Sequence, residues 1–238
     1  MVKDTDPADL RRVTDVTYHG FVHGTMSALR RMQPRDRGTI VQVGSALAYR
    51  AIPLQASYCA AKFAIRGFTD ALRCELMHDG SNVALTMVQM PGLNTPQFTS
   101  VRTTLSCQPQ PVPPIFQPEV AAHAIVWAAE HPRREVHVGA NTAVIIAGNK
   151  LMPWLGDRYL ARTNVEAQQT DEPVPPDHQD YLYGSLEVDY GAHGPFDERA
   201  KPASRYFDVA VRHRNALLGA GGAALAAGAG ALGFRRAR

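Results

Sequence analysis

The sequence has too few cysteines for a disulfide framework or a sulfur-rich metal site. Its 238 residues contain three, Cys59, Cys74 and Cys107, with no CxxC pair and no histidine at metal-ligand spacing. Cys59 and Cys74 fall inside a predicted helix, where we expect them to pack against other elements. Unpaired cysteines favour a reducing, cytoplasmic compartment. We therefore predict neither a disulfide nor a metal.

The chain also lacks a strong charge of either sign. It has 25 basic and 22 acidic residues, a formal net charge of +3. This excess is too small to indicate a nucleic-acid partner, and no run interleaves lysine or arginine with aromatic residues. The first residues, MVKDTDPADL, lack the apolar core of a secretory signal. The hydrophobic content of 45% is that of an ordinary globular protein.

Helices and strands alternate through the first two thirds of the chain. Asp6 and Pro7 form a helix-start signal, an N-cap followed by proline at the first helical position, and the helix is expected to reach about Met32. The other expected elements are strands at 38–45, 82–90 and 135–139 and helices at 55–78, 118–130 and 142–162, the last broken at Pro153. The order strand, helix, strand, helix, strand predicts parallel β-α-β units with right-handed crossovers.

Two segments lack any regular period. Residues 93–117 are proline-rich and irregular, as in a lid or substrate loop. After Thr163 the composition turns acidic and rich in proline and glycine, which predicts an extended or disordered segment at 164–214. We therefore divide the chain into residues 1–163, 164–214 and an apolar tail rich in alanine and glycine at 215–238.

Three side chains are placed for proton transfer. The β-branched run at 40–43 delivers Ser45 to the carboxyl end of a strand, where ligand sites of parallel sheets lie. Tyr58 and Lys62 are four residues apart and share a helix face. A nearby ammonium lowers the pKa of a phenol from about 10, so that the phenol can act as general acid or base. Ser45 can hydrogen-bond the same substrate oxygen. The Tyr-x-x-x-Lys spacing alone is common in ordinary helices, and a serine at a strand end is common in ordinary turns. The prediction rests on the two together.

The stretch from about Pro7 to Gly139 resembles the short-chain dehydrogenase/reductase family. The matching pieces are GTIVQVGS at 38–45, YCAAK at 58–62, GFTDALRCEL at 67–76 and VQMPGLNTP at 88–96. The resemblance implies an α/β fold with a partial Rossmann-type parallel sheet, the C-terminal half of a doubly wound fold, followed by a disordered or helical tail.

The resemblance also implies the roles of the catalytic residues. Ser45 orients the substrate carbonyl, Tyr58 gives or takes the proton, and Lys62 assists. Thr17 stands where the family usually places an asparagine, in Val-Thr-Tyr-His-Gly at 16–20, and can hold a water. The implied reaction is hydride transfer between a nicotinamide cofactor and an alcohol/carbonyl substrate.

The implied cofactor is NAD or NADP. Tyr58 and Lys62 would bind the nicotinamide ribose, with Pro91 and Gly92 passing under the nicotinamide and Thr95 near its carboxamide. The substrate would be a small molecule, and the apolar lid at 112–116 favours a hydrophobic one.

The family's glycine-rich turn, which holds the cofactor pyrophosphate after the first strand, has no counterpart in this sequence. The G-x-G-x-x-G match at 228–233 follows no strand and opens no β-α-β unit, so we interpret it as spurious. We therefore predict that Met1 is an internal methionine of a longer protein, or that the chain is a degraded relative. In either case the strand at 38–44 has an unpaired apolar edge. The alternative function is a non-catalytic truncated member, acting as an oligomerising scaffold or fragment.

The tail and the long helices suggest two kinds of contact. Residues 215–234 would form either a membrane contact, flanked by arginines, or a flexible low-complexity tail. In the family the two long helices pair across a two-fold axis, which implies a homodimer or tetramer.

Overall fold

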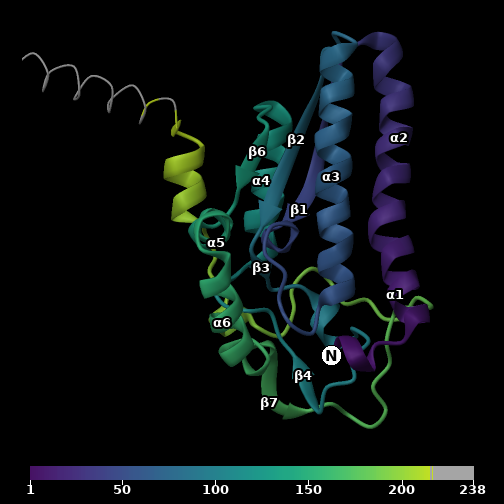
Figure 1. The fold of residues 1–238 in the computed structure, drawn as a ribbon, viewed down its shortest axis with the longest axis vertical. Helices are drawn as coiled ribbons and strands as arrows, with labels where there is room; N and C mark the ends of the chain where they lie inside the picture. The colour runs from purple at the N-terminus through teal and green to yellow at the C-terminus, as the bar shows by residue number, and fades with distance from the viewer. Residues whose placement is uncertain (215, 217–238) are drawn as a thin grey trace, which may run out of the picture.

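A three-stranded parallel sheet forms the centre of the computed structural model, which describes residues 1–214 and 216 (Figure 1). Its order is β1-β2-β6, with bounds Gly38–Ser45, Val83–Met90 and Glu135–His137. The register pairs Gly38 with Val83 and, at the other end, Ser45 with Met90. The predicted α/β class and the parallel sheet are confirmed.

The first predicted helix is present but is interrupted. It comprises α1 (Pro7–Thr14), a π-helical turn (Asp15–His19) and α2 (Gly20–Met32). The Asp6 carboxylate accepts a hydrogen bond from the Ala8 amide at 2.8 Å, as an N-cap should. The sequence pattern did not reveal the π-helical turn, because one extra residue barely changes the spacing of apolar positions.

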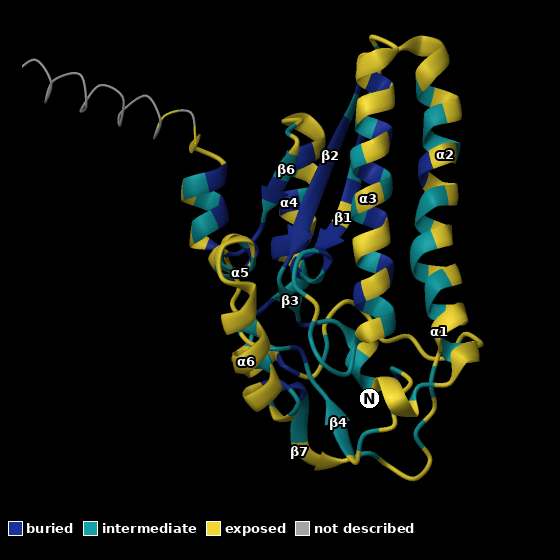
Figure 2. Cartoon of the chain, in the orientation of Figure 1, coloured by how far each residue is buried: buried dark blue, intermediate teal, exposed yellow. Residues whose placement is uncertain are grey.

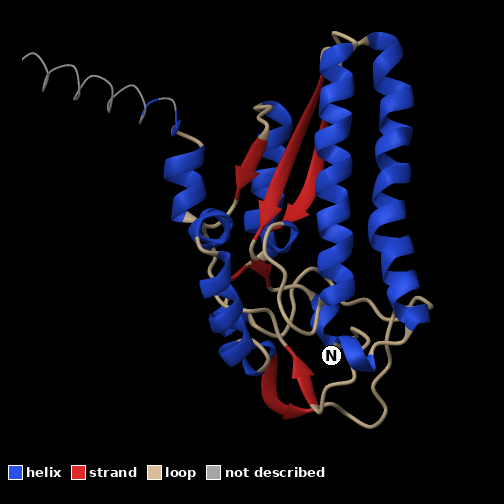
Figure 3. Cartoon of the chain, viewed as in Figure 1, coloured by secondary structure: helices blue, strands red, loops and turns tan. Residues whose placement is uncertain are grey.

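Helices cover both faces of the sheet (Figures 1 and 3). On one face α2 and α3 (Ala56–His78) lie side by side, and α4 (Pro118–Glu130) covers the other. The core on the α3 side contains Ile40, Leu72, Leu76, Val83 and Leu85. The core on the α4 side contains Val88, Met90, Ala124, Val136, Val138 and Phe207. Figure 2 shows β2, in the middle of the sheet, almost entirely buried.

The predicted helix at 142–162 is two helices, α5 (Ala140–Leu151) and α6 (Pro153–Thr163). Proline at the start of α6 ends the first helix because it has no N–H to continue the ladder. The strand at 135–139 and the helix at 118–130 are confirmed to within two residues.

The segments without a period are tied to the body by short strands. β3 (Gly92–Leu93) pairs in parallel with β5 (Ile115–Phe116). β4 (Cys107–Pro109) pairs antiparallel with β7 (Gln169–Pro173). Residues 164–214 are mostly irregular, with β7 and a few short helical turns, and Phe196, Phe207 and Val211 are buried against the rest of the chain.

The cysteines differ in burial, and the tail lies mostly outside the described residues. All three cysteines are free. Cys59 is buried as expected, but the packing role expected for Cys74 is wrong, since it lies exposed on α3 between the buried Leu72 and Leu76. Within residues 1–214 and 216, no helix combines the length and apolarity that crossing a bilayer requires. The predicted membrane contact at 215–234 falls outside the described residues, apart from residue 216.

Candidate active site

Ser45 ends β1 with its hydroxyl held in place. The side chain is buried, and its Oγ accepts a hydrogen bond from the Leu47 amide at 3.1 Å. This bond caps the short 3-10 turn Ala46–Ala48, which begins the loop to α3. The serine therefore sits at the carboxyl end of the sheet, on the edge that the sequence predicted.

Tyr58 and Lys62 come from the first turns of α3 and meet Ser45 there. The Ser45 hydroxyl lies close enough to the Tyr58 phenol to influence its pKa. The Lys62 Nζ lies 5.5 Å from the centroid of the Tyr58 ring and donates to the Val43 carbonyl at 3.1 Å. The structure thus brings the three predicted side chains together around one point.

The expected pKa of Tyr58 is wrong in direction. Burial raises the pKa of Tyr58 to about 12, and the neighbouring Ser45 side chain offsets only part of that effect. Lys62 lies over the ring and bonds a backbone carbonyl, and burial lowers the pKa of its own ammonium. The phenol is therefore protonated at neutral pH.

Thr17 lies on a different element from these three residues. It is half-buried on the π-helical turn Asp15–His19, which packs against α3. Among the described residues no hydrogen bond joins its hydroxyl to Ser45, Tyr58 or Lys62. Single π-helical turns occur often at functional sites, so its position on one is consistent with a role that water would mediate.

Pro91 and Gly92 follow β2 directly, where the loop at 111–116 presses against them. A Cβ at Gly92 would lie 3.0 Å from the Val112 carbonyl oxygen. Thr95 follows two residues after β3, and its amide donates to the Leu93 carbonyl at 3.1 Å. These three candidate cofactor residues therefore form one continuous turn beneath the loop.

Two of the five residues of the predicted hydrophobic lid at 112–116 belong to the core. Ile115 and Phe116 form β5 and are 2% and 6% exposed, so they cannot line a substrate site. Short apolar runs in a proline-rich loop look alike whether they cover a ligand or pack inward. Ile115 and Phe116 therefore give no support to a hydrophobic substrate.

A strap from the C-terminal segment covers this end of the molecule, and no sequence pattern predicted it. We define the strap as residues 177–190. The Arg102 guanidinium binds Asp9 at 2.7 Å and Asp180 at 3.1 Å, joining α1, the 96–102 loop and the strap. The strap also places Tyr181 near enough to Tyr58 to contribute to its raised pKa. Arg102 lies 93 residues from Asp9 and 78 residues from Asp180 in the chain, beyond the reach of any local sequence signal.

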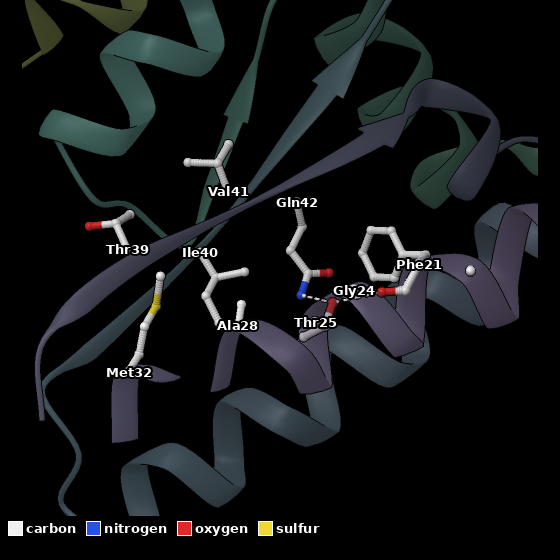
Figure 4. A pocket seen from close by; sticks show the side chains of 10 residues that line it. Phe21, Gly24, Thr25, Ala28, Met32, Thr39, Ile40, Val41 and Gln42 are labelled. Atoms are coloured by element: carbon white, nitrogen blue, oxygen red, sulfur yellow. Dashed lines mark hydrogen bonds between the residues drawn. The ribbon is translucent and has the colours of Figure 1, made fainter. Parts of the chain in front are cut away.

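The free edge of β1 opens on a separate groove of about 380 Å³ (Figure 4). Within the described chain β1 pairs only with β2, as predicted for the edge at 38–44. Figure 4 shows α2 facing this edge, with Gln42 donating to the Thr25 hydroxyl at 3.4 Å. None of Ser45, Tyr58 and Lys62 lines the groove, so it is distinct from the site above.

Known proteins resemble this chain over the segment that carries these residues. The family model of the short chain dehydrogenases matches residues 1–106. The uncharacterized oxidoreductase YxnA of Bacillus subtilis is 31% identical over 182 residues, 76% of this chain and 51% of that protein. Human dehydrogenase/reductase SDR family member 7 is 41% identical over 73 residues, 31% of this chain and 22% of that protein.

One solved structure shows how far the three-dimensional likeness extends. A short chain dehydrogenase from Burkholderia cenocepacia, in complex with NADP, is 25% identical, with a TM-score of 0.46 over 65% of this chain and 60% of that one. The chain spans about half the length of the curated relatives it matches, 51% in the case of YxnA. The matched segment contains Ser45, Tyr58 and Lys62 in their expected elements, and the chain is a member of the short-chain dehydrogenase/reductase family.

Proposed function

We propose that this chain carries the proton-transfer machinery of an oxidoreductase that moves hydride between NAD or NADP and an alcohol/carbonyl substrate. The observation that carries the proposal is the convergence of Ser45, Tyr58 and Lys62 at the carboxyl end of β1. Family membership supports the reaction class.

In the proposed mechanism Tyr58 is the proton donor. With a pKa of about 12 its hydroxyl is protonated at neutral pH and can protonate a carbonyl oxygen as that oxygen gains negative charge. Ser45 donates to the same oxygen and stabilises the developing charge. The cofactor, when bound, supplies or accepts the hydride.

The residues fit one end of the cofactor. Lys62 has three N–H donors, of which one binds the Val43 carbonyl. The other two, with the Tyr58 hydroxyl, would hold the ribose hydroxyls next to the nicotinamide. Pro91, Gly92 and Thr95 would line the nicotinamide from the adjacent turn. No described residue provides a glycine-rich turn between a strand and a helix for the pyrophosphate.

Two observations favour a second function: among the described residues no glycine-rich turn is present to hold the pyrophosphate, and the edge of β1 is open. That function is the non-catalytic scaffold, which keeps the fold of the family and its paired helices without turnover. Lys62 would then have a structural role, bonding α3 to β1 through the Val43 carbonyl.

Calorimetric titration of the 238-residue chain with NADPH and with NADH separates the two functions. The enzyme proposal expects saturable binding that Lys62→Met weakens at least tenfold, because methionine keeps most of the apolar stem and removes the donors. An absence of binding to protein that is folded by circular dichroism would support the scaffold instead.

We also propose a homo-oligomer in the cytoplasm. The long helices expose Val16, Met26 and Phe63, apolar side chains that a partner copy would cover. Multi-angle light scattering at micromolar concentration should give at least twice the monomer mass. A folded monomer at that concentration would contradict the proposal.

A further inference from the structure

The outer face of α5 and α6 exposes a concentration of large apolar side chains. Leu151 is 77% exposed, Tyr159 66% and Trp154 53%. Figure 2 shows these two helices as mostly exposed along one flank of the molecule. The face, which we call the α5–α6 face, comprises Val144, Leu151, Met152, Trp154, Leu155, Arg158, Tyr159 and Arg162.

Helical spacing shows that this face points away from the body. Gly156 and Leu160, four residues apart, are the less exposed positions of α6, and the Arg50 guanidinium lies 3.3 Å from where a Cβ of Gly156 would be. Trp154 and Arg158 are also four apart, on the other side of the helix. Body contacts therefore account for one side of α6 and leave the aromatic side uncovered.

The charge on the uncovered side is positive. The Arg158 guanidinium lies over the Trp154 ring, 5.3 Å from its centroid, and Arg162 follows one turn later. Asp157 is the one acidic residue between positions 140 and 163. Its carboxylate binds Arg50 at 2.6 Å, on the inner side, so it does not neutralise the outer arginines.

We propose that the α5–α6 face binds the surface of a lipid bilayer that contains anionic headgroups. Exposed tryptophan, tyrosine and leucine, next to arginines that form no ion pair within the described part of the chain, are the composition of helices that lie in a membrane interface. Arginine near such a surface gains from the negative potential of anionic lipids. A second copy of the chain is a poorer occupant, because a two-fold contact through this face would bring Arg158 and Arg162 close to their own copies.

This contact is independent of the proposed reaction and of the tail at 215–238. It would place the protein flat on a bilayer through helices of 12 and 11 residues. The carboxyl end of the sheet, with Ser45 and Tyr58, would remain free of the lipid contact, since neither residue belongs to the face.

Sedimentation with vesicles tests the proposal on the full 238-residue chain. Vesicles of phosphatidylcholine with 30 mol% phosphatidylserine (roughly the anionic content that attracts basic faces) are compared with pure phosphatidylcholine. We expect binding to the anionic vesicles, at least tenfold weaker for Trp154→Ser/Leu155→Ser and for Arg158→Glu/Arg162→Glu. The fluorescence of Trp154 should shift to shorter wavelength on binding, and the second tryptophan, Trp127, is removed for this reading by Trp127→Phe.

The control is a substitution at an exposed apolar residue outside the face, and two results would contradict the proposal. Met77→Ser removes an apolar side chain that is 76% exposed on α3, outside the face, and should leave binding unchanged. Binding that survives both double substitutions would place the contact elsewhere, on the tail for instance, and overturn the proposal. If the original chain does not bind vesicles and the double substitutions convert a dimer to a monomer in light scattering, the face binds a second copy of the chain. That result would also overturn the proposal.

Discussion

The Tyr49 hydroxyl donates to Glu135 Oε1 at 2.7 Å, across 86 residues of chain. This bond fastens the loop that follows Ser45 to the start of β6. Arg66 completes the attachment, with its guanidinium 4.1 Å from the Tyr49 ring centroid and a bond to the Ala48 carbonyl at 3.0 Å. The loop between the serine and the tyrosine helix is thus held from two sides, which fixes Ser45 relative to Tyr58.

Glu135→Gln should make the protein less sensitive to acid. Burial raises the pKa of Glu135, but the nearby His137 ring, 3.5 Å away, and hydrogen bonds from Tyr49 and Gln89 outweigh it and lower the pKa from 4.5 to about 2. A lowered pKa stabilises the fold above pH 4.5, and that stabilisation disappears as the pH falls through about 2. Its size is about 2 to 3 kcal/mol. The free energy of unfolding, measured with urea, should therefore fall less between pH 4.5 and 2 for the variant than for the original chain.

The control for this prediction is Glu75→Gln, which changes an exposed carboxylate on α3. It should leave the pH dependence of unfolding as it was. Parallel curves for Glu135→Gln and the original chain would show that the Tyr49–Glu135 bond contributes nothing.

Tyr58→Phe should abolish most turnover in any preparation that reduces a carbonyl substrate. The change removes the hydroxyl and keeps the ring over which Lys62 lies. Loss of a general acid lowers kcat by about 100-fold or more. Tyr183→Phe, in the strap, removes a hydroxyl that donates to Asp9 instead and is the matched control for steady-state kinetics. Near-normal kcat for Tyr58→Phe would exclude it as the proton donor.

Gly92→Ala should destabilise the turn after β2, whereas Gly24→Ala should not. A Cβ at Gly92 meets the Val112 carbonyl at 3.0 Å, so the loop at 111–116 must move. A Cβ at Gly24, within α2, meets nothing within 4 Å. Alanine in an open helical position gains about 0.5 to 1 kcal/mol over glycine, and we expect a loss of about 1 kcal/mol at Gly92. Thermal unfolding measures both, and equal shifts would refute the close approach.

Arg102→Met should release the strap without unfolding the body. Arg102 bridges Asp9 and Asp180, and the Tyr181 amide donates to the Ser100 carbonyl at 3.3 Å. Hydrogen exchange of the peptide at 178–184 should become faster, while peptides of β2 remain protected. Arg31→Met, an arginine whose partner is Ser27 on its own helix, serves as the control. Unchanged exchange in the strap would mean that other contacts hold it.

Many helix boundaries could be predicted from the sequence because the residues that set them act locally. Asp6 caps the first helix, Gly80 ends α3 with a positive φ of 62°, and Pro153 separates α5 from α6. Each of these acts through the backbone of its own neighbourhood, so a single sequence is enough to place it. The same holds for the spacing of Tyr58 and Lys62, which one helix fixes.

Other features depended on residues that meet only in the folded chain. The pairing of β4 with β7, the strap held by Arg102 and the Tyr49–Glu135 bond join segments at least 60 residues apart. No periodicity reports such contacts, because each partner alone looks like an ordinary polar or loop residue.

The sequence by itself determined the order of helices and strands, the parallel sheet and the delivery of Ser45, Tyr58 and Lys62 to one end of it. The tertiary structure decided the electrostatics of that end. Spacing predicted an ammonium that lowers the pKa of Tyr58, whereas burial raises it to about 12. Burial depends on what the rest of the chain places around a side chain, here α3, the loop after β1 and Tyr181 of the strap, and that arrangement is not encoded in the spacing of two residues on a helix.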